Sequence, residues 1–493
     1  MLFKKPSKKE RTTITTEDLG YLPIPRLLRY YTIPSLVGAI VNSLYNVVDR
    51  IFIGQGVNSL AISGLAVTFP ILIFLQAFGV LIGVGTSARI SILLGQGRRD
   101  EAENLLGNSF ILSIITSLVA IALMMFFLDD LLYSFGASEA TIPYARDYLS
   151  IVIPGNIFAN LTYSYNAVMR STGYPRKAMI TMIIGALLNA LLDPLFLFGF
   201  GWGIKGVAWA TVISMFVGMC YVMHHFVDKR SLLNIRPQYF RLKWKYIISI
   251  ISIGVAPFAM QFTASFVNVI KNTSLLTYGG DYAVGAYGIV NSLATLVIMI
   301  MLGLSLGMQP IIGYNYGSGK MQRVKEAYYT TRRLNVLIGL VSTLLALFLP
   351  RTLAKAFTLD PQLIDVAEVA IRLELLALWA VGYQSTTTQF FQSLGYASRA
   401  VALSLSRQII FLTPLLLILP RCGLGLKGVW IAAPVSDLLS CLSAIIMMLL
   451  FRKRFQEEEQ RVLSGSEGVP IEPSTTGEGL GTHAPADRRK GIE

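Results

Sequence analysis

Runs of about twenty or more mostly apolar residues recur along the chain and limit its fold more than any other feature. Examples are 105–128, 178–198, 207–227 and 429–450. A helix needs roughly 20 such residues to cross the hydrocarbon core of a bilayer. Only 14% of the residues are charged, against about 25% in ordinary soluble domains. The sequence therefore predicts an all-α polytopic membrane protein.

The apolar runs divide the chain into transmembrane helices, lobes and tails. We predict twelve transmembrane helices, at 27–51, 60–94, 104–128, 142–170, 178–199, 205–227, 247–276, 282–316, 327–349, 364–394, 399–419 and 427–451. The corresponding units are a cytoplasmic N-terminal tail (1–26), an N-lobe (27–227), a cytoplasmic inter-lobe loop (228–246), a C-lobe (247–451) and a disordered cytoplasmic C-terminal tail (452–493). Prolines inside several predicted helices, such as Pro34 and Pro257, predict kinks.

The placement of the basic residues predicts the orientation in the membrane. The formal net charge is +14, but Lys and Arg gather in the N-terminal tail and in alternate loops, with Arg351, Lys355 and Arg421 as exceptions. By the positive-inside rule these loops are cytoplasmic. We therefore expect a multi-pass protein of the cell (inner) membrane with both termini in the cytoplasm. The basicity reflects topology, so nucleic acid is not an expected partner.

An internal repeat relates the two halves of the chain. Gly-Trp-Gly-Ile-Lys-Gly-Val at 201–207 returns as Gly-Leu-Gly-Leu-Lys-Gly-Val at 423–429. The same offset carries Gly95 onto Gly317, and Pro34 falls one residue from Pro257. Six helices per repeat make the two halves parallel, and such halves commonly form two lobes around a central cavity. We expect two pseudo-symmetric six-helix lobes that rock to expose this cavity to either side.

Polar residues on the first predicted helix lie on one face. Asn42, Tyr45, Asn46 and Asp49 follow the spacing i, i+3, i+4 and i+7. An ionisable residue inside a membrane helix suggests a functional site. The alternative is that Asp49 forms a simple pair with Arg50 near the outer surface.

A second polar group lies on the fifth and sixth predicted helices. Asn189 and Asp193 are i, i+4 neighbours that precede Pro194, and Thr211 adds a hydroxyl. At about 1.5 Å per residue, Asp193 lies roughly 24 Å from the cytoplasmic end of its helix, and Thr211 lies roughly 9 Å from the outer end of its own. Tyr148 reaches the same level, and Asp49 also falls in the outer part of the membrane. We expect these side chains to form one pocket, although Asp193 could instead serve only to end its helix.

The repeat separates the residues of this pocket from those that serve the fold. The second half has no equivalent oxygens, because the offset carries Asn189 to Phe411, Asp193 to Leu415 and Thr211 to Ala433. Residues needed for the fold alone should be similar in both halves. The difference therefore indicates a functional site confined to the N-lobe.

Three ionisable residues in the second half allow two interpretations. Lys271, Glu374 and Arg407 either line the central cavity or form buried pairs. No catalytic triad, metal-ligand, phosphate-loop or redox motif is found in the chain, and its three cysteines form no framework. We therefore expect no enzyme activity and no cofactor.

These features resemble the multidrug and toxic compound extrusion (MATE) family, in the bacterial branch with DinF-like and MepA-like members. The resemblance covers about residues 25–450, and the family has the same two-lobed architecture. The segments that support it are Pro34 followed by Asp49 in Val-Val-Asp-Arg-Ile-Phe-Ile-Gly, Gly-Gln-Gly-Arg at 95–98, Gly-Tyr-Pro-Arg at 173–176, and Asn189 with Asp-Pro at 193–194.

The resemblance implies a secondary active multidrug exporter that exchanges amphipathic or cationic small molecules for H⁺ or Na⁺. The aspartate that matches Asp49 is the family's central coupling carboxylate, and the residues that match Asp193, Asn189 and Thr211 complete a proton or Na⁺ site. Those that match Tyr148 and Asn166 line the same cavity. We expect the substrate cavity to include Tyr45, Asn46, Tyr148, Asn166, Gln261 and Lys271, and the protein to be a monomer.

Three other functions remain as alternatives: a flippase, a channel and a receptor. Related two-lobed proteins are flippases of lipid-linked oligosaccharides, which would require several arginines in the cavity and a lateral opening. A channel would conduct without saturable exchange, and a receptor would be expected to carry a soluble sensory or enzymatic domain.

Overall fold

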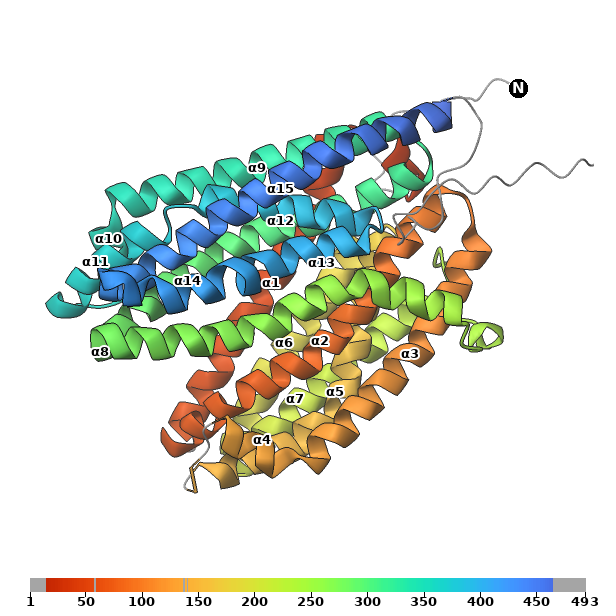
Figure 1. The fold of residues 1–493 in the computed structure, drawn as a ribbon. Helices are drawn as coiled ribbons and strands as arrows, with labels where there is room; N and C mark the ends of the chain where they lie inside the picture. The colour runs from red at the N-terminus through yellow and green to blue at the C-terminus, as the bar shows by residue number, and fades with distance from the viewer. Residues whose placement is uncertain (1–14, 57–58, 136–137, 140, 464–493) are drawn as a thin grey trace, which may run out of the picture.

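The computed structural model describes residues 15–56, 59–135, 138–139 and 141–463, except for the side chains of 42–51, 53–63, 66, 265 and 281 (Figure 1). The first half contains α1 (Ile24–Gly56), α2 (Ser59–Gly95), α3 (Arg99–Phe126), α4 (Leu128–Ser134), α5 (Ile142–Ser171), α6 (Pro175–Pro194) and α7 (Gly203–Val227). Short helical turns lie at Glu17–Gly20, Leu195–Gly199 and Pro237–Tyr239.

The second half contains α8 (Trp244–Gly317), α9 (Met321–Phe348), α10 (Pro350–Lys355), α11 (Pro361–Glu374), α12 (Leu378–Ser393), α13 (Ala397–Leu405), α14 (Thr413–Ile418) and α15 (Gly425–Leu463). Short π-helical turns at Ser406–Leu412 and Pro420–Leu424 flank α14. The described residues form no strand. α8 comprises two helices that meet at Gly280, whose φ of 65° and ψ of −162° suit glycine alone.

The helices account for all twelve predicted membrane crossings. Among the described residues, nine helical segments are long and apolar enough to span a bilayer, including the two halves of α8. α1, α5 and the α11–α12 pair correspond to the other three predicted helices. The prediction of an all-α polytopic fold is confirmed.

The helices form two lobes that meet along α2 and α8 (Figure 1). In the first lobe α5 packs on α2, α3 and α7, while α1 lies along α6. In the second lobe α9 packs on α12, and α12 contacts α15. Figure 1 shows α9–α15 on one side of the molecule and α2–α7 on the other, with α8 along the boundary.

Glycines allow the lobes to approach closely. A Cβ atom on Gly254 of α8 would lie 1.8 Å from the carbonyl oxygen of Leu81 on α2. A Cβ atom on Gly85 of α2 would lie 2.0 Å from the carbonyl oxygen of Ile250 on α8. Real Cβ atoms do not approach closer than about 3 Å. Any side chain larger than hydrogen would therefore push the two helices apart.

A second pair of close contacts follows the sequence repeat. A Cβ atom on Gly95 would lie 2.1 Å from the carbonyl oxygen of Tyr314, and one on Gly317 would lie 2.1 Å from that of Ile92. Nearby, Gln309 Nε2 donates to Ser87 Oγ at 3.2 Å, a pair whose members are 222 residues apart. These pairs relate α2 to the second half of α8 by a pseudo-twofold axis.

The structure describes the N-terminal segment from residue 15, within the range predicted as a tail. Asn315 Nδ2 donates to the carbonyl oxygen of Leu19 at 2.9 Å, and Arg323 Nη2 donates to the same oxygen at 3.0 Å. Thr16 Oγ1 donates to the carbonyl oxygen of Thr172 at 3.1 Å. This segment therefore contacts both lobes.

The prediction of a disordered tail from residue 452 is wrong as far as Leu463, because α15 continues to that residue. Glu458 accepts hydrogen bonds from the hydroxyls of Tyr316 and Tyr396, and Lys325 pairs with Glu459 at 2.6 Å. These contacts hold the polar end of α15 against the last turn of α8, the beginning of α9 and the residue that precedes α13.

Candidate functional site

Three predicted site residues meet where α6 and α7 lie side by side. Asn189 Nδ2 donates to Asp193 Oδ1 and to Thr211 Oγ1, each at 3.3 Å. Thr211 Oγ1 donates in turn to the carbonyl oxygen of Val207 at 3.0 Å. The spacing i, i+4 places Asn189 and Asp193 on one face of α6, and Thr211 faces them from α7. We call these three residues the N-lobe oxygen cluster.

The N-lobe oxygen cluster is removed from solvent. Asp193 is 0% exposed, Asn189 1% and Thr211 3%. Within the described part of the chain, Asn189 Oδ1 has no hydrogen-bond partner. A buried amide oxygen without a partner costs free energy, and carboxylate, amide and hydroxyl oxygens are the ligands that hard cations prefer. The donor set therefore fits a proton on the carboxylate or a small hard cation.

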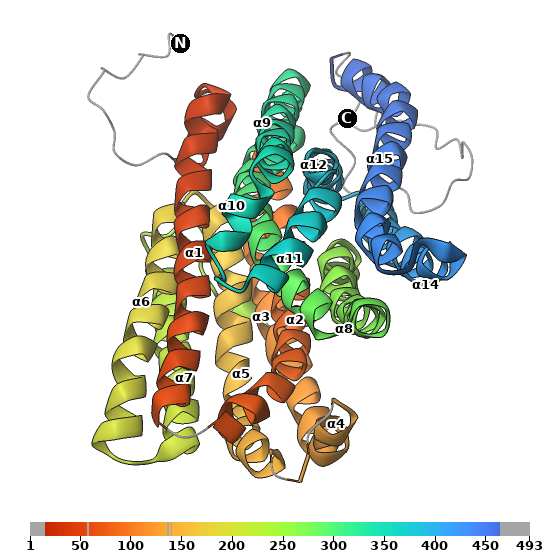
Figure 2. The same cartoon turned by 90° about the vertical axis from the view of Figure 1, so that its left-hand side faces the viewer.

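Asp49, the predicted central carboxylate, lies outside the described side chains, as do Tyr45 and Asn46. The backbone places their helix, α1, against α6 and α7 (Figure 2). The helix that carries Asp49 is therefore a neighbour of the two helices that form the N-lobe oxygen cluster. That the Asp49 side chain shares a pocket with the cluster remains a prediction.

The other predicted cavity residues lie in different surroundings. Tyr148 is 4% exposed and lies in an apolar cluster with Val152 of α5 and Val207 of α7. Asn166 Nδ2 donates to the carbonyl oxygen of Ala178 at 2.7 Å, and its Oδ1 accepts from the Arg170 guanidinium.

Asn166 is therefore separated from the N-lobe oxygen cluster by most of the length of α6. Ala178 and Asp193 are about 22 Å apart along that helix at 1.5 Å per residue. The structure does not bring Asn166 to the cluster. Gln261 lies half-buried on α8.

The three ionisable residues that the sequence analysis singled out in the second half form ion pairs inside the C-lobe. Lys271 of α8 pairs with the Glu374 carboxylate of α11, and its Nζ lies 4.2 Å from the ring centroid of Tyr287. Arg407 Nε contacts Asp437 Oδ1 of α15 at 2.7 Å. Lys271 is 4% exposed. Of the two interpretations that the sequence allowed, the structure supports the buried pairs.

Asp437 is an ionisable residue that the sequence analysis missed. It is 6% exposed and neutralises the guanidinium of Arg407. The available signal was a single carboxylate inside the apolar run 427–451. Such a residue generally needs a partner inside the protein.

Comparison with known families identifies the chain. The MatE family model matches residues 34–195 and again residues 257–417. The protein belongs to the MatE family. The two matched segments begin at Pro34 and Pro257, the prolines that the internal repeat had already paired. The predicted family is thereby confirmed.

Several members of the MatE family are similar over nearly their whole length. The multidrug export protein MepA of Staphylococcus aureus (strain MRSA252) is 25% identical over 457 residues, which cover 91% of this chain and 99% of that protein. MepA of Staphylococcus haemolyticus (strain JCSC1435) is 26% identical over 438 residues, or 89% and 96% of the two chains.

Solved structures of MATE proteins share the fold. A MATE crystal structure in the bent conformation aligns with a TM-score of 0.85 at 24% identity, covering 91% of this chain and 99% of that one. An outward-facing multidrug resistance MATE family transporter aligns with a TM-score of 0.83 at 25% identity, again covering 91% and 99%. The prediction of two six-helix lobes agrees with this architecture.

Proposed function

We propose that this MatE protein is a secondary active exporter that exchanges amphipathic or cationic small molecules for H⁺ or Na⁺. The observation that carries the proposal is the N-lobe oxygen cluster, a fully buried carboxylate beside an amide and a hydroxyl at membrane depth. The similarity to proteins named multidrug export protein supports the direction and the substrate class.

The chemistry of coupling follows from the cost of burying charge. An ionised carboxylate is expensive in a low-dielectric interior unless a proton or a cation neutralises it. Binding of H⁺ or Na⁺ at Asp193 would remove that cost and let the surrounding helices pack differently. Loss of the ion would restore the charge and attract a cationic substrate. A single site can thereby link ion entry to substrate release.

The two lobes provide the alternating access. Parallel six-helix lobes commonly rock about a central site. With the basic loops in the cytoplasm, the close contacts at Gly85, Gly254, Gly95 and Gly317 lie in the cytoplasmic half of the interface. The described arrangement then corresponds to an outward-facing state. Ion binding would favour separation of these contacts and the inward-facing state.

Lys271 and Arg407 make the flippase alternative less suitable. A flippase of lipid-linked oligosaccharides would need cations free to hold phosphate in the cavity. Lys271 and Arg407 are each paired with a carboxylate. We therefore prefer small-molecule export.

Transport by Asp193→Asn in proteoliposomes tests the proposal. Ethidium transport should be measured with a pH gradient and a Na⁺ gradient imposed separately. We expect at least about a tenfold loss of gradient-driven transport, because one protonation or cation site is worth more than about 1.4 kcal/mol. Asp147→Asn is the matched control, since Asp147 is an exposed carboxylate that pairs with Lys205 at 3.3 Å.

Thr211→Val distinguishes the two ions. Loss of the hydroxyl oxygen should weaken a Na⁺ site and leave protonation of Asp193 largely intact. Undiminished transport by Asp193→Asn under both gradients would contradict the proposed coupling site.

A further inference from the structure

A short segment before α1 lies across the cytoplasmic faces of both lobes. We call residues 15–22 the N-terminal strap. Leu19, in the middle of the strap, is 0% exposed and packs in an apolar cluster with Met321 of α9. Its carbonyl oxygen accepts hydrogen bonds from Asn315 Nδ2 and Arg323 Nη2. The centre of the strap is therefore buried in the C-lobe, although α1, the helix that follows it, lies along α6 of the N-lobe.

Further bonds hold the strap to the C-lobe. Arg323 Nη2 also donates to the carbonyl oxygen of Leu22 at 2.5 Å. Lys320 Nζ donates to the carbonyl oxygen of Gly20 at 3.2 Å and lies 3.8 Å from the ring centroid of Tyr21. Hydrogen bonds from charged donors are roughly twice as strong as those between neutral groups. These bonds and the buried leucine make the strap a stable part of the C-lobe surface.

The contact of the strap with the N-lobe is weaker. In the part of the protein that the structure describes, one hydrogen bond joins the strap to that lobe, from Thr16 Oγ1 to the carbonyl oxygen of Thr172 at 3.1 Å. Both groups are neutral, and a single bond of this kind changes an equilibrium by roughly two- to tenfold. Thr172 lies in the turn between α5 and α6, which the positive-inside rule places in the cytoplasm. Thr16 is therefore the point at which the strap can separate from the N-lobe at little cost.

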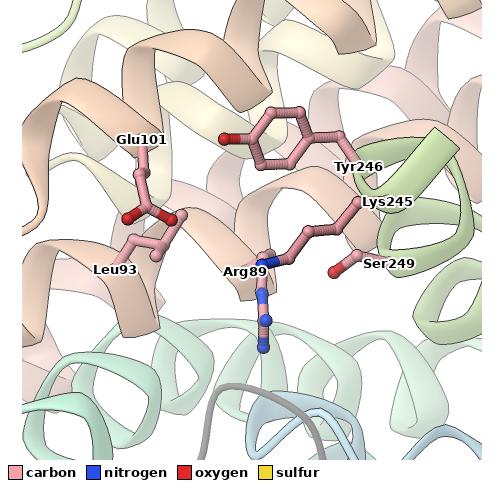
Figure 3. Close-up of a pocket in the computed structure, with 6 residues that line it drawn as sticks. All are labelled: Arg89, Leu93, Glu101, Lys245, Tyr246 and Ser249. Atoms are coloured by element: carbon pink, nitrogen blue, oxygen red, sulfur yellow. The ribbon is translucent and has the colours of Figure 1, made fainter. Parts of the chain in front are cut away.

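The internal repeat indicates that the docking groups of the strap are not needed for the fold alone. The offset of the repeat carries Asn315 onto Leu93 and Arg323 onto Glu101. Figure 3 shows Leu93 and Glu101 on one side of a small hollow, with Tyr246 of α8 on the other. A leucine side chain has no polar atom, and an ionised glutamate only accepts hydrogen bonds. The donors that receive the strap are therefore peculiar to the second half.

We propose that the N-terminal strap is a latch, which moves with the C-lobe and helps to hold the cytoplasmic side closed through the Thr16–Thr172 hydrogen bond. When the lobes separate on the cytoplasmic side, this bond breaks while the bonds from Asn315 and Arg323 persist. The latch thereby adds a small bias toward the outward-facing state. The inference rests on the proposed movement of the lobes, but it requires neither a particular coupling ion nor a particular substrate.

Distances from the strap to each lobe test the latch. In the full-length protein without its native cysteines, one spin label would be placed at position 17. The second label would be placed either at position 229, which follows α7, or at position 453 of α15; all three residues are exposed. The variants are Thr16→Val, which removes the hydroxyl donor, and Thr16→Ser, which keeps it. Thr277→Val is the matched control, because Thr277 is exposed and its hydroxyl donates to the carbonyl oxygen of Thr273 in the same helix.

Thr16→Val should raise the ratio of the longer to the shorter distance between positions 17 and 229 about fivefold, which corresponds to about 1 kcal/mol for one neutral hydrogen bond. The distance between positions 17 and 453 should stay the same. Thr16→Ser and Thr277→Val should match the wild type. Equal distributions between positions 17 and 229 in the wild type and Thr16→Val, or a change between positions 17 and 453 instead, would overturn the proposal. The measurement uses no substrate and no ion gradient, so a failure of the coupling assigned to Asp193 would leave this test unaffected.

Discussion

Gly254→Ala should shift the equilibrium between the two states of the transporter. The new Cβ atom would lie 1.8 Å from the carbonyl oxygen of Leu81, and real Cβ atoms stay at least about 3.0 Å from such atoms. The backbones of α8 and α2 would have to separate by about 1.2 Å. Overpacking of this kind costs about 1–3 kcal/mol. The cost arises only while the lobes touch, so the closed cytoplasmic contact should become about 5- to 150-fold less favoured relative to the open state.

The shift can be measured as a distance between the lobes. Spin labels on cysteines at positions 229 and 453 would report the separation of the cytoplasmic ends of α7 and α15, in a protein without its native cysteines. Gly254→Ala should increase the population with the longer distance. Gly85→Ala should act in the same direction, because its Cβ atom would lie 2.0 Å from the carbonyl oxygen of Ile250.

Gly288→Ala is the matched control on the same long helix. A Cβ atom at position 288 meets nothing within 4 Å, so this variant changes helix propensity without a clash. If Gly254→Ala and Gly288→Ala give the same distance distribution, the close glycine contact does not determine the state of the lobes. A loss of folded protein in Gly254→Ala alone would likewise contradict the prediction, because the cost of the new methyl group would then not be confined to the closed state.

Three further predictions concern stability. Lys271→Met and Glu374→Leu should each destabilise the protein by about 3–5 kcal/mol, because each leaves a buried charge without its partner. The double variant should lose much less stability. A double-mutant cycle in a denaturant titration measures the coupling, and additive losses would contradict the prediction. Arg323→Ala should expose residues 15–22 to protease without unfolding the helices, because Arg323 donates to the carbonyl oxygen of Leu19; limited proteolysis followed by mass spectrometry would reveal the cut. Burial, and secondarily Glu458, raises the pKa of Tyr396 to about 12. The stability that the neutral hydroxyl contributes is therefore present below pH 10 and is lost as the pH rises through 12. In unfolding measurements, the stability of Tyr396→Phe should decline less over that range than the stability of the wild type.

The sequence predicted those features that depend on local periodicity. Apolar runs located the membrane helices, and the internal repeat related Gly95 to Gly317. The spacing of Asn189 and Asp193 placed both on one helix face. Their contact with Thr211 could be predicted from depth in the membrane, because residues on neighbouring antiparallel helices can meet only if they lie at the same depth.

Pairings across long separations could not be predicted in the same way. Lys271 and Glu374 are 103 residues apart, and many helix arrangements would give each residue another neighbour. The continuation of α15 depends on Tyr316 and Tyr396, which lie far from Glu458 in the sequence. Polar composition alone suggested a solvated tail there, since the contacts that order it come from other helices.

The bonds of the N-terminal segment set the order in which the chain can complete its fold. Leu19 leaves the ribosome early, yet the side chains that receive it, Asn315 and Arg323, are made about three hundred residues later. Leu19 therefore cannot form these hydrogen bonds until a large part of the second lobe has been synthesised and inserted. The contacts of residues 15–22 with Thr172 and Asn315 then connect this early-made segment to both lobes. Their formation is therefore a late step in folding.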